Sequence, residues 1–524
     1  MNQSNTSTTS PYFINYTGLS DGIYYYNATA YDSAGSYAST TTQNITIDTT
    51  YPLIDLASPY TQTGNYTQTY IEANISVTEI NLANITTYLY NTTGLVSSNT
   101  STSSPHFVNF TSLPDGIYYL NATTYDNAGN YNSTATQTII LDNTAPTISL
   151  NAPANTFNTS TTEINFNWTT TDALDSSLLC NLTIDGTVNA SDIASTSGAA
   201  TNYSVSGFAD GSYSWNMTCW DHVNNTNTSS TRTFTIDTTN PAISYESPTD
   251  TAGDYADRNY AQINISATDT NFVNVTIYLY NSTLDQLYAN TSTTSPYFIN
   301  YTGLSDGVYY YNATAYDSAG NSNSTTTRNI TIDTTNPQID LASPYTQTGN
   351  YTQTYIEANI SVTETNLANI TIYLYNTTGL VNSNTSTSSP HFVNFTSLPD
   401  GTYYLNATTY DNAGNYNSTA TQTILIDTTN PAISYESPTD TAGDYADRNY
   451  AQINISATDT NLVNITIYLY NSTLDQLYAN TTTTSPNFIN YTGLSDGIYY
   501  YNATTYDSAG NSNSTTTRNI TIDT

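Results

Sequence analysis

Two short sequence markers recur along the chain with one spacing. Successive copies of each lie 94, 95, 96, 94 and 96 residues apart, by subtraction of their positions. The first is the Asp of an Asp-Gly pair before a Tyr-rich run, at Asp21, Asp115, Asp210, Asp306, Asp400 and Asp496. The second is an Asp that ends an apolar run, at Asp48, Asp142, Asp237, Asp333, Asp427 and Asp523. Two independent markers with a common period indicate tandem structural modules.

The period divides the chain into one partial and five complete modules. The predicted domains are 1–48 (partial), 49–142, 143–237, 238–333, 334–427 and 428–524. The stretches that begin near 240 and 430 are nearly identical, which favours a protein that gains length or presents repeats over one with a unique active site. Because 1–48 corresponds to the last half of a module, we expect the chain to be a window on a longer protein. A neighbouring protomer that donates strands to this half-module is a further hypothesis.

Within each module the hydrophobic period is two. Runs such as QINISAT, NVTIYLYN and RNITID alternate polar and apolar residues, and Ser-Pro, Asp-Gly and Ala-Gly-Asn turns separate them. We count about seven short strands and no amphipathic helix in a module. This predicts an all-β chain, a tandem array of immunoglobulin-like or fibronectin-III-like β-sandwich modules. In the module 238–333 the phase points ten side chains inward: Ile263, Ile265, Val275, Ile277, Leu279, Tyr309, Tyr311, Ala313, Ile330 and Ile332.

The end of each module resembles a known domain type. The stretch DGVYYYNATAYDSAGNSNSTTTRNITIDTTNP is similar to the last two strands and linker of bacterial and archaeal Ig-like domains, and it recurs six times. Such domains repeat in large surface adhesins and other cell-surface proteins. The resemblance implies the sandwich fold and an extracellular or cell-surface location, but these domains act both as spacers and as binders.

The charge of the chain excludes several partners. The 524 residues carry 41 acidic and 5 basic side chains, a formal net charge of −36, and the basic residues are all arginines. Five scattered arginines cannot form a surface for nucleic acid or for anionic lipid. No segment reaches the roughly 20 apolar residues of a membrane helix. We therefore expect no nucleic-acid partner and no membrane insertion in this segment.

The tripeptide Asn-x-Ser/Thr occurs throughout the chain, and in strands it places Asn and hydroxyl on one face. Two interpretations are open: N-linked glycans on an exported chain, or Asn and Thr as plain uncharged surface residues. Asn is depleted in strands, which favours glycans, and the density of sites together with the resemblance points to an archaeal cell surface. The predicted acceptors are Asn15, Asn27, Asn44, Asn74, Asn84, Asn121, Asn181, Asn216, Asn264, Asn274, Asn312, Asn329, Asn359, Asn369, Asn406, Asn454, Asn464, Asn502 and Asn519.

Both cysteines lie in the module 143–237. The strand phase points Cys180 and Cys219 inward, on strands expected to be the third and sixth and therefore neighbours. We predict a disulfide, consistent with an oxidising compartment; the alternative is two buried free thiols. Trp215 shares the inward phase and is expected in the core.

Three acidic residues recur at every junction between modules. One ends a module and two lie in loops of the next. The sets are Asp48, Glu79, Asp126; Asp142, Asp172, Asp221; Asp237, Asp269, Asp317; Asp333, Glu364, Asp411; and Asp427, Asp459, Asp507. An Ig-like topology brings these loops to the end where the linker enters, so each set predicts a calcium site that would stiffen the junction. The alternative is ordinary turn and capping chemistry of Asp.

No enzyme is expected. His106, His222 and His391 lie in separate modules, and no phosphate loop, zinc spacing or nucleophile motif occurs. The predicted function is a structural extracellular protein: a heavily N-glycosylated rod or filament that self-associates into a fibre or surface array as a stalk, sheath or fibre. The alternative is a cell-surface adhesin whose repeats attach to a surface glycan or protein receptor. Calcium and N-linked glycans are the only cofactors considered.

Overall fold

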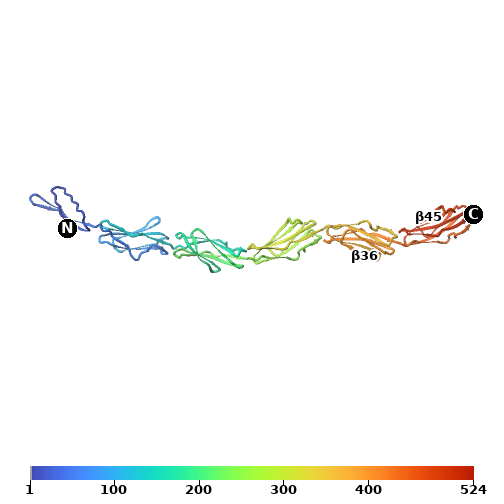
Figure 1. The fold of residues 1–524 in the computed structure, drawn as a ribbon, viewed down its shortest axis with the longest axis horizontal. Helices are drawn as coiled ribbons and strands as arrows, with labels where there is room; N and C mark the ends of the chain where they lie inside the picture. Colours follow the sequence, from blue (N-terminus) through green and yellow to red (C-terminus); the bar gives the residue numbers. More distant parts are fainter. Residues whose placement is uncertain (1–2) are drawn as a thin grey trace. The chain divides into compact units, whose positions relative to one another are not determined.

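The computed structural model describes residues 3–524, which form two compact units. Among these residues, one unit comprises 3–240 with Asp317–Asn321 and the other Pro241–Tyr316 with Ser322–Thr524. Secondary structure in residues 3–524 is strand only, and no helix there could span a bilayer. Figure 1 shows modules built from strands alone, from the blue N-terminal residues to the module that contains β45. An all-β chain of repeated two-sheet sandwiches is therefore confirmed.

The C-terminal module illustrates the topology of a complete module. Its strands are β41 (Ala432–Tyr435), β42 (Asp444–Ala446), β43 (Tyr450–Thr458), β44 (Leu462–Tyr470), β45 (Gln476–Thr482), β46 (Asn487–Thr492), β47 (Gly497–Asp507), β48 (Ser512–Ser514) and β49 (Arg518–Ile522). One sheet has the order β41-β43-β46. The other has the order β42-β49-β47-β44-β45, with β48 paired to β47. All pairs are antiparallel except β42 with β49. The sheets face each other as in an Ig-like sandwich.

The other complete modules repeat this order. Residues 49–142 contain β5 (Leu53–Leu56), β6 (Gly64–Tyr66), β7 (Tyr70–Thr78), β8 (Leu82–Asn91), β9 (Gly94–Ser101), β10 (His106–Thr111), β11 (Gly116–Asp126), β12 (Tyr131–Ser133) and β13 (Gln137–Leu141). Residues 143–237 contain β14 (Thr147–Ala152), β15 (Phe157–Thr159), β16 (Glu163–Thr171), β17 (Ser177–Ile184), β18 (Thr187–Thr196), β19 (Ala200–Ser206), β20 (Gly211–Trp220), β21 (Thr226–Thr228) and β22 (Arg232–Ile236).

The next two modules have the same nine strands. Residues 238–333 contain β23 (Ala242–Tyr245), β24 (Asp254–Ala256), β25 (Tyr260–Thr268), β26 (Phe272–Tyr280), β27 (Gln286–Ser292), β28 (Tyr297–Thr302), β29 (Gly307–Asp317), β30 (Ser322–Ser324) and β31 (Arg328–Ile332). Residues 334–427 contain β32 (Gln338–Leu341), β33 (Gly349–Tyr351), β34 (Ile356–Thr363), β35 (Leu367–Asn376), β36 (Gly379–Ser386), β37 (His391–Phe395), β38 (Gly401–Asp411), β39 (Tyr416–Ser418) and β40 (Gln422–Ile426).

Each complete module thus has nine strands where the sequence suggested about seven. The first strand is divided in two, because the Ser-Pro pair after β41 interrupts pairing and the chain then crosses to the other sheet as β42. Proline lacks the N–H that a sheet ladder needs. The ninth strand is the short β48, which returns from the Asp-Ser-Ala-Gly-Asn turn to pair with β47.

The period-two phase identifies the core. In residues 238–333 every side chain predicted to point inward is fully buried except Tyr309, which is half-buried. The hydroxyl of Tyr309 donates to the carbonyl oxygen of Ser305 at 3.0 Å, which holds the ring at the edge of the core. Alternation along the strand therefore determined which face is buried.

The partial module contains β1 (Gly22–Tyr26), β2 (Thr29–Tyr31), β3 (Tyr37–Ser39) and β4 (Gln43–Ile47), in a β1–β4 pair and a β2–β3 hairpin. Its inward positions lack a facing sheet. Tyr26 is 53% exposed, whereas Tyr501 at the same place in the last module is fully buried.

The predicted disulfide is present. Cys180 on β17 lies directly opposite Cys219 on β20, with the Cα atoms 4.1 Å apart, and the bond joins neighbouring strands of one sheet. Trp168 and Trp215 are buried in the same core, where Trp215 packs edge-on against Phe166 at 5.0 Å between ring centroids. The cross-link therefore reinforces the most aromatic core of the chain.

Reduction of the protein should lower the midpoint temperature of one calorimetric unfolding transition and leave the other midpoints unchanged, because the only two cysteines belong to one module. A disulfide that closes a loop of 39 residues contributes about 4 kcal/mol to the free energy of unfolding. The measurement is scanning calorimetry with and without reductant, and the C180A/C219A double variant serves as a reductant-insensitive control. A shift spread over several transitions would contradict the assignment.

Candidate functional site

Two asparagine side chains tie each linker to the module that follows it. In the C-terminal module, Nδ2 of Asn511 donates to the carbonyl oxygen of Asp427 and to Oδ2 of Asp507, both at 2.7 Å. Nδ2 of Asn513 donates to the carbonyl oxygen of Pro431 at 3.1 Å. The linker is therefore held at two carbonyls by one turn, an arrangement that we call the junction clamp.

The junction clamp recurs with the same partners elsewhere. Asn130 and Asn132 hold the carbonyl oxygens of Asp48 and Pro52; Asn225 and Asn227 hold those of Asp142 and Pro146; Asn415 and Asn417 hold those of Asp333 and Pro337. The aspartate of the turn orients the first asparagine. Oδ1 of Asp507 accepts the backbone N–H groups of Ala509, Gly510 and Asn511. These hydrogen bonds within the turn fix the position from which Asn511 reaches the linker.

A third tie comes from the module before the linker. Oδ1 of Asp400 accepts the backbone N–H of Thr428 at 3.0 Å and its hydroxyl at 2.9 Å, and Oδ2 accepts the hydroxyl of Thr429 at 2.8 Å. Burial would raise the pKa of Asp400, but these hydrogen bonds to the charged carboxylate outweigh it and lower the pKa. The linker is therefore bound on both sides.

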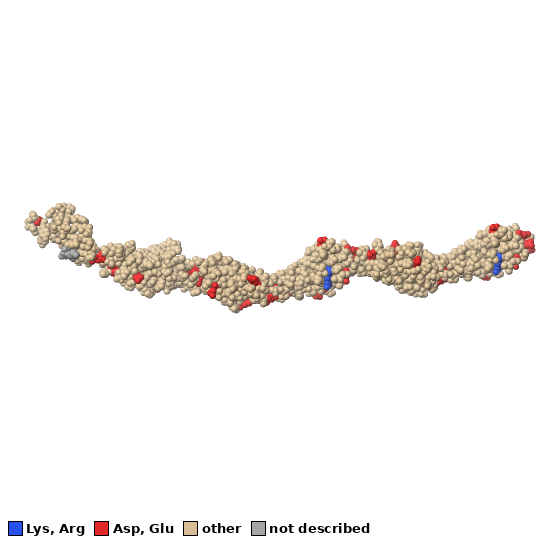
Figure 2. All heavy atoms as spheres, in the orientation of Figure 1, with Lys and Arg blue, Asp and Glu red and all other residues tan. Residues whose placement is uncertain are grey.

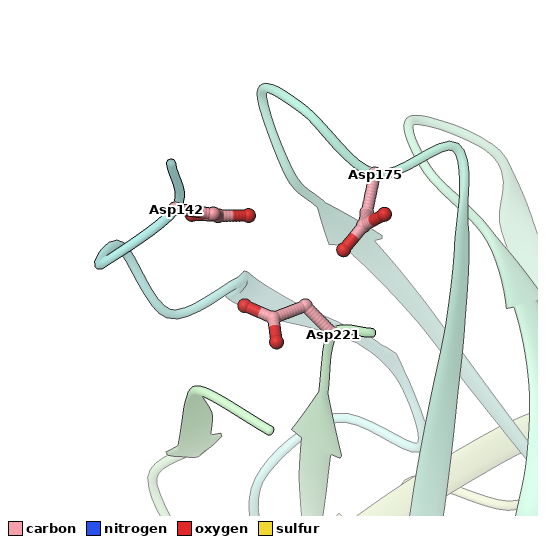
Figure 3. Close-up of side chains that lie close together, drawn as sticks. All are labelled: Asp142, Asp175 and Asp221. Carbon is pink, nitrogen blue, oxygen red and sulfur yellow. The ribbon is translucent and has the colours of Figure 1, made fainter. Parts of the chain in front are cut away.

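Acidic side chains converge beside two of these linkers. Figure 3 shows the carboxylates of Asp142, Asp175 and Asp221 turned toward one another. One oxygen from each lies within 4.8 Å of the others, and the same holds for Asp427, Asp459 and Asp507. In each set the first and third residues are buried and the second is half-buried. Several carboxylate oxygens around one space form the kind of donor set that calcium takes.

In the first of these clusters, the residue that joins Asp142 and Asp221 is Asp175 and not the expected Asp172. Oδ1 of Asp172 accepts the backbone N–H groups of Leu174 and Asp175, each at 2.9 Å, so it caps the loop that presents Asp175. Asp175 also lies 3.0 Å from Nδ1 of His222. The sequence located the loop, and the loop conformation determined which of its two aspartates points inward.

The two sets that contain glutamate do not converge in this way within residues 3–524. Oε1 of Glu79 accepts the backbone N–H of Asn81, and Nδ2 of Asn81 donates to Oδ2 of Asp48 at 2.8 Å. Glu364, Asn366 and Asp333 repeat this arrangement. Asp126 and Asp411 orient the first asparagine of the junction clamp, as Asp221 and Asp507 also do. The set of Asp237, Asp269 and Asp317 takes residues from both units, whose relative placement is not determined (Figure 1).

Electrostatics favour a cation at the Asp142 cluster. The pKa of Asp142 is raised to about 6, first because burial disfavours its charged form and then because the carboxylates of Asp172, Asp221 and Asp115 repel it, although the backbone N–H of Thr144 opposes the shift. A bound divalent cation would relieve the same repulsion.

All five arginines make contacts inside their own modules. Arg232 donates to the carbonyl oxygens of Leu150 and Pro153, Arg258 and Arg448 pair with Asp250 and Asp440, and Arg328 and Arg518 lie over the rings of Tyr245 and Tyr435. Figure 2 shows acidic side chains scattered over a mostly uncharged surface with few basic atoms. Within residues 3–524 the arginine ion pairs involve neither aspartate cluster, and His222 is the basic side chain that lies beside Asp175.

The predicted acceptor asparagines follow the strand phase but differ in exposure. Asn15, Asn27 and Asn44 are exposed, Asn454 is buried, and the rest are half-buried. The clamp asparagines were missed as a functional group, although the recurring Ala-Gly-Asn-x-Asn spacing carries a signal for them.

Domain-family comparisons match segments of all five complete modules. A profile described as "Bacterial Ig-like domain" matches residues 240–334, a second with that description matches 348–428 and 449–524, and "Bacterial Ig-like domain (group 3)" matches 105–204. No curated protein sequence matches the chain.

Solved structures with similar folds include three multidomain fragments. The fibronectin(III)-like modules of Clostridium thermocellum CbhA are 17% identical over 35% of this chain and 94% of that one, with a TM-score of 0.23. Sidekick-1 immunoglobulin domains 1–5 are 10% identical over 90% of this chain and 98% of that one, with a TM-score of 0.26. Chicken CNTN1 FN1–FN3 domains are 11% identical over 54% of this chain and 98% of that one, with a TM-score of 0.24. These scores are low, and the fold assignment rests on sheet topology and the domain-family matches.

Replacement of Asn511 by alanine should loosen the linker, because the carbonyl oxygen of Asp427 and the carboxylate of Asp507 lose their shared donor. We expect a loss of about 1–3 kcal/mol in the stability of the module 428–524 and faster proteolysis within residues 427–431. Ser512→Ala, an exposed position on β48, is the matched control. Cleavage at the control rate would show that the clamp does not restrain the linker.

Proposed function

The chain belongs to the bacterial Ig-like domain proteins, and from this premise we propose that it is a structural protein of the cell exterior, a glycosylated rod or filament of repeated modules. The observation that carries the proposal is the junction clamp. Equivalent pairs of asparagine amides hold linkers of the same length after Asp48, Asp142, Asp333 and Asp427. A linker tied to both neighbours favours a stiff spacer over a flexible string.

Three features support an extracellular location. Bacterial Ig-like domains are typical of surface and extracellular proteins. The disulfide between Cys180 and Cys219 suits an oxidising compartment. The acceptor tripeptides in strands place Asn on the face away from the core, where glycans could be attached at asparagines that are not bonded into the fold. Ig-like families are typically non-catalytic, and a site repeated from module to module fits a structural role.

Calcium belongs to the proposal at the all-aspartate clusters. The oxygens of Asp427, Asp459 and Asp507 surround one space at a linker that the junction clamp already restrains. Calcium takes about six to eight oxygen ligands, which three carboxylates, backbone carbonyls and water can supply. A cation bound to the linker aspartate and to two loops of the next module would cross-link the junction.

Chelation should lower the midpoint temperature of unfolding of the module 428–524 by roughly 10 °C. This value assumes that free calcium before chelation is about a hundredfold above Kd. The module 334–427 should not respond, because Asp333, Glu364 and Asp411 do not bring their carboxylate oxygens together within residues 3–524. Calorimetry with calcium or chelator tests this. D459N should abolish the response and E364Q should leave it unchanged. A transition at 428–524 that ignores chelator would remove calcium from the proposal.

The intact mass of the protein from its native source should exceed the sequence mass and fall on enzymatic deglycosylation. The purified chain should also form fibres or ordered arrays by electron microscopy. An unmodified mass would remove glycosylation from the proposal.

Dispersed monomers that bind cells or immobilised glycans would instead support adhesion. Stacked tyrosine pairs such as Tyr278 and Tyr280, 6.2 Å apart on the outer face, favour this second candidate because amphipathic rings are common at interfaces.

A further inference from the structure

Four predicted acceptor asparagines are built into the fold. In the module 238–333, Nδ2 of Asn264 donates to the carbonyl oxygen of Ser247 at 2.8 Å, while the backbone N–H of Asn264 donates to the hydroxyl of Thr249. The backbone carbonyl oxygen of Asn264 accepts the backbone N–H of Glu246. Oδ1 is buried without a hydrogen-bond partner. Asn264 therefore tethers the Ser-Pro segment to β25 through its side chain and backbone.

The other three copies make the same tether. Nδ2 of Asn74 donates to Ser58 at 3.1 Å, that of Asn359 to Ser343 at 3.0 Å, and that of Asn454 to Ser437 at 2.9 Å. Oδ1 is buried and unpaired in each, and all four lie in an Asn-Ile-Ser sequence. We call these four the tether asparagines.

A phenylalanine stands beside each tether asparagine on the opposite side from the Ser-Pro segment. The register pairs Asn264 with Phe298, Asn74 with Phe107, Asn359 with Phe392 and Asn454 with Phe488. Directly opposite residues have Cβ atoms about 4.5–5.5 Å apart. A tether asparagine is thus enclosed by a hydrogen bond on one side and an aromatic ring on the other.

The strand that carries these phenylalanines has its own Asn-x-Thr sequences. Two residues after each phenylalanine come Asn109, Asn300, Asn394 and Asn490, followed two residues later by a threonine. All four are exposed, and their side chains make no hydrogen bond to any described residue. We call these the edge asparagines, because β10, β28, β37 and β46 each form the open edge of the three-stranded sheet.

These edge strands lack the usual protection against pairing with another chain. None of the four carries an Asp, Glu, Lys or Arg, and each exposes its phenylalanine by 44–53%. Proteins commonly guard such edges with charges, bulges or proline within the strand. An uncharged edge with an exposed aromatic residue invites strand addition, so a bulky polar group on the edge asparagine would supply the missing protection.

We propose that the edge asparagines Asn109, Asn300, Asn394 and Asn490 carry glycans that guard the open sheet edge, and that the tether asparagines Asn74, Asn264, Asn359 and Asn454 stay unmodified. The proposal rests on the glycosylation proposed above and selects its sites. In the modification, Nδ2 bonds to C1 of a sugar linked through C1 to phosphate. The C1–O bond breaks, the phosphate leaves with the electron pair, and Nδ2 loses one proton. An exposed Nδ2 meets this requirement, whereas a tethered one must first release the Ser-Pro segment.

Site mapping by glycopeptide mass spectrometry tests the assignment on the protein from its native source, after digestion with chymotrypsin because the chain has no lysine. Sugar on the edge asparagines and bare tether asparagines are expected. Glycans on Asn264 or Asn454, or bare edge asparagines in a chain glycosylated elsewhere, would overturn the assignment while leaving the proposed glycosylation standing. A chain without any sugar would overturn both.

The guarding role needs a separate comparison of glycosylated variants. Replacement of all four edge asparagines by glutamine should produce oligomers in sedimentation velocity at a concentration too low for the parent to assemble. The matched control replaces Asn121, Asn312, Asn406 and Asn502, which lie on central strands of the other sheet and have no open edge to protect; it should sediment like the parent. Monomeric behaviour of the edge variant at the concentration where the parent is measured would overturn the guarding role.

Discussion

The hydrogen bonds that asparagine amides donate to linker carbonyls are the interaction on which the tandem arrangement depends. Each module can bury its own core, but nothing in a sandwich determines how its neighbour is attached. The amides of Asn511 and Asn513 bind two carbonyls of one linker, and the aspartate of the same turn holds the first amide in place. Because the side chains are neutral, the attachment survives on a chain with almost no cations.

At the junctions between modules the acidic residues have two structural roles. Asp400 serves as a hydrogen-bond acceptor for the linker, whereas one carboxylate oxygen from each of Asp427, Asp459 and Asp507 lies near a common space. Asn and Thr supply the remaining polar surface. Some of these asparagines, such as Asn264, brace the fold, and others, such as Asn300, stand free at a sheet edge. One residue type thus serves as clamp, tether and proposed glycan acceptor.

Prediction from sequence succeeded where one periodicity governs the result. Alternation along β25 and β29 identified Ile263, Ile265 and Tyr311 as core, and it placed Cys180 and Cys219 inward on neighbouring strands. It was less informative for sites assembled by loops. Asp172 and Asp175 lie in one loop, and only the fold shows that the first caps it while the second faces Asp142. Likewise Glu79 and Asp459 occupy equivalent places, yet only the aspartate belongs to a cluster.

The sequence by itself determined the module length, the strand phase, the buried face and the disulfide, because each follows from a repeat period or from the two-residue alternation of a strand. Tertiary structure alone decided which asparagine is enclosed and which is free, and which carboxylates meet. Asn264 and Asn300 have nearly the same local sequence chemistry, but one lies on the central strand beside the Ser-Pro segment and the other on the edge. Their difference arises from contacts between segments distant in sequence, which no local pattern encodes.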